Sequence, residues 1–306
     1  MPNRTDQRVS FVLRFLALMS ALLLALIVAF LVLESWPLFT ETSVAGSNDN
    51  DISGDTLFRL FQSDGWYPLE GRFGMAPMIW ASLAVTLGAI TLALPVGLAS
   101  AIFLQFYAHA SLVPGFRLLL NLLAGVPSVV FGLWGLTRLV PLIASWQPPG
   151  ASLLAAILVL ALMILPTVAL TSAAALAAVP RELNAGAVAL GLGRKSAILR
   201  VILPAAKSGI ISGLVLAAVR ALGETMAVLM VAGNVVQNPS GLFEPVRVLT
   251  ANIALEMAYA MGEHRASLFA SGLLLTLVVW VLVRVAARQV NQHRRGNSHR
   301  KVAPRA

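Results

Sequence analysis

Residues 179–234 read VPRELNAGAVALGLGRKSAILRVILPAAKSGIISGLVLAAVRALGETMAVLMVAGN and decide the fold of the chain. A basic amphipathic segment comes first, and an apolar segment follows that exceeds the roughly 20 residues a helix needs to cross a bilayer. Arg220 and Glu224 are expected near the middle of that apolar segment. Charges at membrane depth cost about 2.5–3.5 kcal/mol each on insertion scales, so they persist where they face a bundle interior or a water-filled path. The rest of the chain is therefore expected to be a scaffold that holds this unit in a membrane.

The composition places the chain in the membrane class. Its 306 residues are 58% hydrophobic and 11% charged, with a mean hydropathy of +0.84, whereas soluble globular chains carry about 25% charged residues. The net charge of +9 gathers beside the ends of apolar runs. That distribution is typical of membrane topology, so nucleic acid is not an expected partner. The chain has no cysteine and four scattered histidines, so neither thiol chemistry nor a metal site is expected.

Long apolar runs predict an all-α integral membrane protein with about six spans. They cover residues 9–33, 76–106, 118–140, 151–178, 208–232 and 266–285. The first run could be a signal peptide, but its length and the lack of an adjacent small-residue cleavage site favour a retained span. In the polar loop that follows, residues 49–54 resemble the start of a calcium-binding loop. Position twelve of that loop is Leu60 rather than the Glu that the ion needs, so a solvated acidic loop is expected.

The charge distribution predicts that both termini are cytoplasmic. Most of the 22 Lys and Arg residues lie on the terminal side of the six spans, whereas only Asp6 and Glu182 of the 13 acidic residues do. The expected parts of the chain are a cytoplasmic N-terminus with the first span, an extracytoplasmic loop, a core that includes a cytoplasmic basic loop, and a basic cytoplasmic tail that contacts membrane lipid. These parts cover residues 1–33, 34–75, 76–285 with the loop at 179–207, and 286–306.

The basic loop at 179–207 is expected to form two short helices, at 183–190 and 195–203, with glycines between them and Pro204 at the end. Such a pair suits docking to another protein, and the residues alone leave open a loop lying on anionic lipid. The glycines do not form a phosphate-binding loop, because the residue after Gly191 is Leu192 rather than Lys. We therefore expect this chain not to be an enzyme, and any ATP hydrolysis to occur on a partner.

The charged pair of the fifth span is expected to share one helix face, because Arg220 and Glu224 are four residues apart. A functional pair facing a path is favoured over a structural ion pair, since Arg before Glu is the poorer order for pairing. Small residues every four positions suit close packing, either at a subunit interface or against the third span of the same chain. They are Gly209, Gly213, Ala217 and Ala221.

Part of the basic loop resembles the EAA loop of ABC importer permeases. The matching positions are Ala185, Gly186, Ala187, Gly191, Val201, Leu203 and Pro204. The chain departs from the pattern at Ala185, where the family has Glu, and at Gly186, near the family's second Ala. In the family this loop inserts into a cleft on the nucleotide-binding subunit, so the resemblance implies the fold of a type I importer permease and an ATPase-coupling loop.

Residues 220–228, RALGETMAV, closely resemble the signature of phosphate ABC transporter permeases. Ala232-Gly233-Asn234 and residues 124–135 match the PstC type better than its PstA partner, and Trp66-Tyr67-Pro68 also resembles the PstC pattern before its second span. The resemblance implies a bacterial inner-membrane phosphate importer with a PstA-like second permease, a PstB-like ATPase dimer that uses ATP and Mg, and a PstS-like extracytoplasmic binding protein. No cofactor is expected on this chain. The resemblance also implies that the matching Arg and Glu matter for transport, and we assign the substrate path to Arg220, Glu224 and Thr225.

A physical role for the pair can be stated beside the resemblance. Arg220 would attract the anion through its fixed fork of donors, and Glu224 would orient Arg220 and accept a proton-bearing phosphate oxygen that sulfate lacks. Three alternatives are a permease for another oxyanion such as sulfate or molybdate, a secondary transporter that needs no ATPase, and a scaffold that anchors a sensor complex. Inverted repeats would support the secondary transporter, and no clear internal repeat is present.

Overall fold

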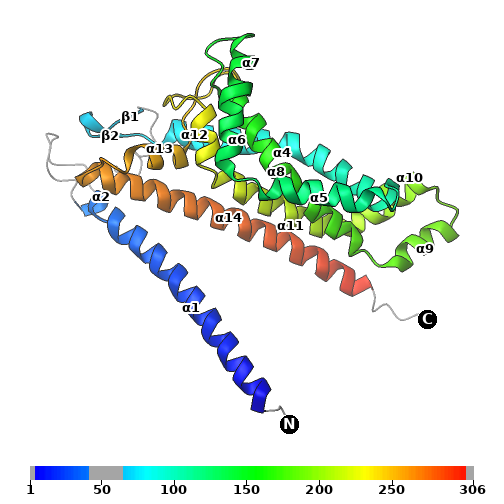
Figure 1. Cartoon of the computed structure of the whole chain (residues 1–306). Coiled ribbons are helices and arrows are strands. Elements are labelled where there is room, and N and C mark those ends of the chain that lie inside the picture. The colour runs from blue at the N-terminus through cyan, green and yellow to red at the C-terminus, as the bar shows by residue number, and fades with distance from the viewer. Residues whose placement is uncertain (1–3, 41–64, 301–306) are drawn as a thin grey trace. The chain divides into compact units, whose positions relative to one another are not determined.

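The computed structural model describes residues 4–40 and 65–300, and helices make up most of it (Figure 1). The acidic stretch with the calcium-like start, residues 49–60, lies outside the described residues, as does the end of the basic tail. In chain order the first elements are α1 (Arg4–Ser35), α2 (Pro37–Thr40), β1 (Trp66–Tyr67), the 3₁₀ turn η1 (Pro68–Glu70), β2 (Arg72–Phe73), α4 (Ala76–Ile102), the π-helix η2 (Phe103–Tyr107), α5 (Leu112–Gly125), α6 (Ser128–Trp134), the π-helix η3 (Gly135–Leu139) and α7 (Val140–Ala144).

The second half of the chain is also helical. It contains α8 (Leu153–Ala177), α9 (Arg181–Ala189), α10 (Arg194–Ala197), the π-helix η4 (Ile198–Ile202), α11 (Leu203–Leu222), α12 (Met226–Val231), α13 (Leu249–Glu256) and α14 (Gly262–Arg300). Five helices of the described part are long and apolar enough to cross a membrane, and a bent helix pair raises the number to six. The prediction of an all-α membrane protein with about six spans is therefore confirmed.

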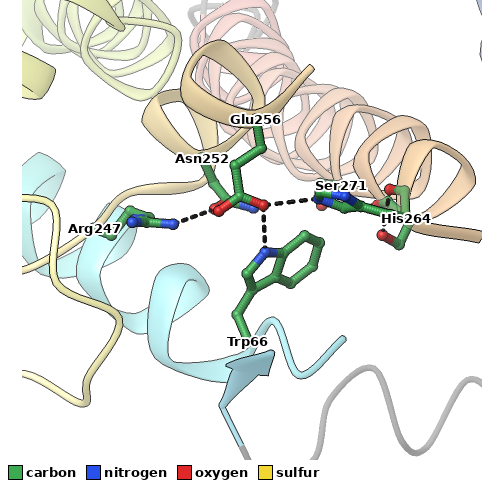
Figure 2. A network of polar contacts seen from close by, with 7 residues as sticks. Trp66, Arg247, Asn252, Glu256, His264 and Ser271 are labelled. Carbon is green, nitrogen blue, oxygen red and sulfur yellow. Dashed lines mark hydrogen bonds and ion pairs between the residues drawn. The ribbon is translucent and has the colours of Figure 1, made fainter. Parts of the chain in front are cut away.

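The chain divides into two compact units. In the unit formed by residues 1–75 and 253–276, β1 and β2 pair as an antiparallel hairpin with Trp66 opposite Phe73. Trp66 Nε1–H donates to Glu256 Oε2 at 2.6 Å, and His264 Nε2 lies 2.8 Å from the same oxygen (Figure 2). Because Glu256 and Trp66 are both buried, this polar cluster fixes the hairpin to the helical part of its unit.

The other unit, residues 76–252 and 277–306, has α8 at its centre. Two thirds of the apolar window of α8 is buried, more than in any other span of the described part. Glycines bring α4 close to it, since a Cβ on Gly88 would lie 2.6 Å from Ile157 and a Cβ on Gly97 would lie 2.8 Å from Val168. A helix that is apolar on every side is typically buried inside a bundle, and α8 accordingly lies in the core of this unit.

The third predicted span is not one straight helix. It consists of Leu112–Gly125 and Ser128–Ala144, which are bent by 89° at the break between them. Val126 has extended backbone with φ −64° and ψ 129°, as expected for a residue before proline, which is disfavoured in the helical region. Pro127 then opens α6 without a backbone donor.

The fifth span differs from its predicted bounds at both ends. Pro204 does not end the preceding helix, because the chain is helical without interruption over Arg194–Leu222. The π-helix η4 precedes the proline, and Leu203 N–H bonds to Ile198 O five residues back, which accommodates a residue that has no N–H to donate. The helix then ends at Leu222 instead of continuing to residue 232, so the break falls beside the charged pair.

The small-residue stripe of α11 packs on α8 of the same chain rather than on the third span. A Cβ on Gly209 would lie 2.7 Å from the Ala175 side chain, and a Cβ on Gly213 would lie 2.6 Å from Thr171 Cβ. Small residues allow two helices in a membrane to approach closely. The stripe therefore holds α11 against the central helix of its unit.

Gly213→Ala is expected to lower the stability of the protein by about 1–3 kcal/mol, because overpacking a close contact forces neighbours to shift. The added methyl would meet the Thr171 side chain, whose hydroxyl is held by Thr167 O at 2.7 Å. Gly186→Ala is the matched control, since a Cβ there meets no atom within 4 Å. The thermal unfolding midpoint in detergent measures both, and equal midpoints for the two variants would contradict the packing argument.

Candidate functional site

The two charged residues predicted for the substrate path stand at a helix break, not on one helix. Arg220 lies in the last turn of α11, and Glu224 follows the end of that helix at Leu222. The predicted shared helix face is therefore wrong. Among residues 9–38 and 65–288, whose side chains the structure describes, none forms an ion pair or hydrogen bond with Arg220, and the Arg220 side chain is exposed. Its charge lies at the negative end of the α11 dipole, which stabilises it.

Glu224 has a structural role, as a helix cap, that was not predicted from the sequence. Its carboxylate Oε1 accepts a hydrogen bond from Ala227 N–H at 3.2 Å, so it caps the first turn of α12. Its backbone carbonyl accepts from Thr250 Oγ1 at 2.9 Å. The spacing from Glu224 to Ala227 is that of a capping residue and could have suggested this role, had the helix end been placed at Leu222.

Thr225, the third predicted path residue, is half-buried directly after Glu224. Its Oγ1 lies 3.5 Å from Gly223 O, and its carbonyl accepts from Leu229 N–H at 2.9 Å. Arg220 thus lies in the last turn before the break, and Glu224 and Thr225 lie within the break. A helix interrupted inside a membrane is tolerated where it is buried in protein or lines a water-filled cavity.

One face of α11 is exposed in this chain and carries polar residues. Ser212, Leu216 and Arg220 are exposed at four-residue spacing, and Ser212 Oγ bonds to Ser208 O at 3.0 Å. A guanidinium in contact with hydrocarbon is costly. This face therefore suits a partner chain or a water-filled path better than lipid.

The bent third span reaches the same region through its second half. Gly132 of α6 lies so close to α12 that a Cβ there would be 2.9 Å from Ala227 Cα. Gly135, which follows it, packs in the same way on Val231 and on Val159 of α8. Two interrupted helices thus pack against each other just beyond their breaks, an arrangement that transporters use to build sites at membrane depth.

The predicted coupling loop is a helix–turn–helix. After α9, the chain turns at Gly191, whose φ of +73° favours glycine, and α10 begins at Arg194. Ala185 and Gly186 are exposed on α9, whereas Ala187 is buried. Val201 and Leu203 are half-buried and Pro204 is exposed. The positions of the EAA-like pattern are therefore distributed over α9, the turn at Gly191, η4 and the start of α11, and are not gathered at one point.

The loop is anchored on one side and open on the other. Ile198 and Ile202 are buried in a cluster with Ala101 of α4 and Leu176 of α8, and the Arg194 guanidinium lies 4.8 Å from the centre of the Tyr107 ring. Four large apolar residues of the loop are exposed instead. They are Leu183, Val188, Leu190 and Leu199, of which Leu190 is 82% exposed. An exposed apolar group on a fixed helical frame is typical of a docking surface.

The part of the chain that the structure describes has no group of three or more His, Cys, Asp or Glu side chains that could hold a metal. The candidate site is a helix break next to one cationic side chain, and α11 connects it to the helix–turn–helix formed by α9 and α10.

Comparison with known proteins places these features in a family context. The family described as binding-protein-dependent transport system inner membrane component matches residues 93–296. A probable ABC transporter permease, YqgH of Bacillus subtilis, is 36% identical, and the match covers 76% of this chain and 77% of the relative. The phosphate transport system permease protein PstC of Pasteurella multocida is 31% identical over 89% of this chain and 88% of its own length.

Solved structures show the same fold at lower identity. An inward-facing MetNI methionine ABC transporter chain matches with a TM-score of 0.58 at 18% identity, over 79% of this chain and 99% of that one. A chain of a bacterial ABC transporter for the import of alginate matches with a TM-score of 0.59 at 17% identity, over 93% and 99%. The fold of type I ABC importer permeases, as expected from the sequence, is thereby confirmed.

Proposed function

We propose that this chain, which belongs to the family of binding-protein-dependent transport system inner membrane components, transports phosphate. It is the multi-pass permease component of an ABC importer that works with an ATPase and a substrate-binding protein. The observation that supports phosphate is the similarity over most of the chain to permeases named PstC. Arg220 is exposed at the end of α11 and has no partner among the described side chains, which fits an anionic substrate.

The partners follow from the same proposal. A PstA-like permease would complete the path, a PstB-like ATPase dimer would bind ATP and Mg, and a PstS-like protein would deliver phosphate from outside the cell. Both termini and the coupling loop would then lie in the cytoplasm, as the positive-inside distribution of Lys and Arg favours. The chain itself would supply the path and no covalent chemistry.

The continuous helix from α10 to α11 suggests how ATPase closure reaches the path. Arg194–Leu222 forms one helical segment of 29 residues, which at 1.5 Å per residue extends about 40 Å. Its first turn belongs to the docking loop and its last turn carries Arg220. A movement of the loop would therefore displace the guanidinium, and the π-helix η4 is a place where the helix can adjust.

The proposal is tested by uptake of labelled anions in phosphate-starved cells that lack only this chain. Restoring the chain should restore phosphate uptake and leave sulfate and molybdate uptake as they were. Equal membrane levels are checked by blotting. Restored uptake of sulfate or molybdate without phosphate would assign the chain to another oxyanion and would overturn the proposal.

A further inference from the structure

The break between α11 and α12 leaves backbone polar groups that need partners, because no bulk water is available at membrane depth. Two local bonds satisfy the donors at its start, from Gly223 N–H to Val219 O and from Glu224 N–H to Ala221 O. Among the described residues, one hydrogen bond reaches residues 223–225 from outside α11 and α12. It runs from Thr250 Oγ1 to Glu224 O at 2.9 Å.

Thr250 is itself held in place. It lies in the first turn of α13 and is 9% exposed. The preceding residue, Leu249, donates its N–H to Ser82 Oγ of α4 at 3.0 Å, and Ser82 Oγ donates to Met78 O at 2.7 Å. Both Ser82 and Leu249 are buried. The first turn of α13 is therefore fixed to α4, which packs on the central helix α8.

We propose that Thr250 is a positioning residue for transport, which acts by holding the backbone of Glu224. With the carbonyl held, the Glu224 carboxylate stays on Ala227 N–H, and the end of α11 that carries Arg220 keeps its place. The hydroxyl is the essential group, because valine has the same shape but would leave Glu224 O without its donor. The inference about geometry stands on the contacts alone, and its consequence for phosphate uptake rests on the proposed function.

Two variants separate the hydroxyl from the shape of the side chain. Thr250→Val keeps the volume and removes the donor, whereas Thr250→Ser keeps the donor. In cells that contain the complete transporter, Thr250→Val should lower the maximal phosphate uptake rate about 5- to 10-fold, the range expected from loss of one hydrogen bond. The half-saturating phosphate concentration should change by less than about twofold if the Thr250 bond acts only on the path. Thr250→Ser should transport within about twofold of the wild type, because it retains the bond.

Amide hydrogen exchange gives a readout that does not depend on the substrate. In the transporter reconstituted with its partners in lipid nanodiscs, amides of residues 223–231 should exchange about 5- to 10-fold faster in Thr250→Val. They should exchange as in the wild type in Thr250→Ser, and amides of α8 should be unchanged in both variants.

The outcomes decide between the proposals. Unchanged exchange in Thr250→Val, or equally fast exchange in Thr250→Ser, would show that the bond does not hold the break. Faster exchange with unchanged uptake would show that the break needs no such positioning, which also overturns the inference. If the wild type takes up no phosphate while the exchange pattern is as expected, the assignment of phosphate fails and the role of Thr250 in holding Glu224 stands.

Discussion

Arg220→Gln should lower phosphate uptake about 10- to 100-fold at equal membrane level, since a hydrogen bond to a charged group contributes about 1.5–3 kcal/mol. Arg220 is exposed at the end of α11, and no described side chain neutralises it. Glutamine keeps donors and much of the length but removes the charge. The loss is therefore expected in the rate of transport, with little effect on folding.

Arg117→Gln is the matched control for this substitution. Arg117 is also an exposed arginine on a helix of the same unit, in α5, and has no partner among the described side chains. Uptake of labelled phosphate by starved cells is measured for both variants and for the wild type. If Arg220→Gln transports as well as Arg117→Gln, then Arg220 belongs to the scaffold and not to the path.

Leu190→Asp should abolish copurification of the ATPase subunit while the chain still inserts into the membrane. The side chain is 82% exposed at the end of α9, so its replacement costs this chain little. If it is buried in a cleft of the ATPase, loss of the leucine costs about 1.5–3 kcal/mol. An unpaired carboxylate in its place adds a further desolvation penalty.

The control for Leu190→Asp is Leu69→Asp, because Leu69 is fully exposed on η1, the turn that connects β1 and β2. Affinity purification of the tagged permease, followed by quantification of the bound ATPase, measures both variants. A single substitution tests docking more specifically than a deletion of residues 185–200 would, because the deletion would also remove Ile198, which is buried in the core. ATPase retained by Leu190→Asp at the wild-type ratio would place the coupling surface elsewhere.

The spans and the helix–turn–helix of the basic loop could be predicted from the sequence because both depend on local composition. Apolar length alone indicates a membrane helix, and the first, second, fourth and sixth spans lie close to their predicted positions. Gly191 marked the turn between α9 and α10, since its positive φ is one that glycine adopts readily. The bend at Pro127 and the passage of the helix through Pro204 were missed. The effect of a proline depends on how the preceding turn adjusts, through an extended residue in one case and a π-helix in the other.

The sequence by itself determined that this chain crosses the membrane several times, that its fifth apolar run carries an arginine and a glutamate, and that a basic helical pair precedes them. These properties reside in short runs of residues. Only the tertiary structure decided that α11 ends at Leu222, that Glu224 caps α12, and that Thr250, 26 residues further on, holds the break. The physical reason is that a span which is apolar on every side carries no periodic signal to show which neighbour it faces. Such partners are chosen by close packing and by the need to satisfy buried backbone groups.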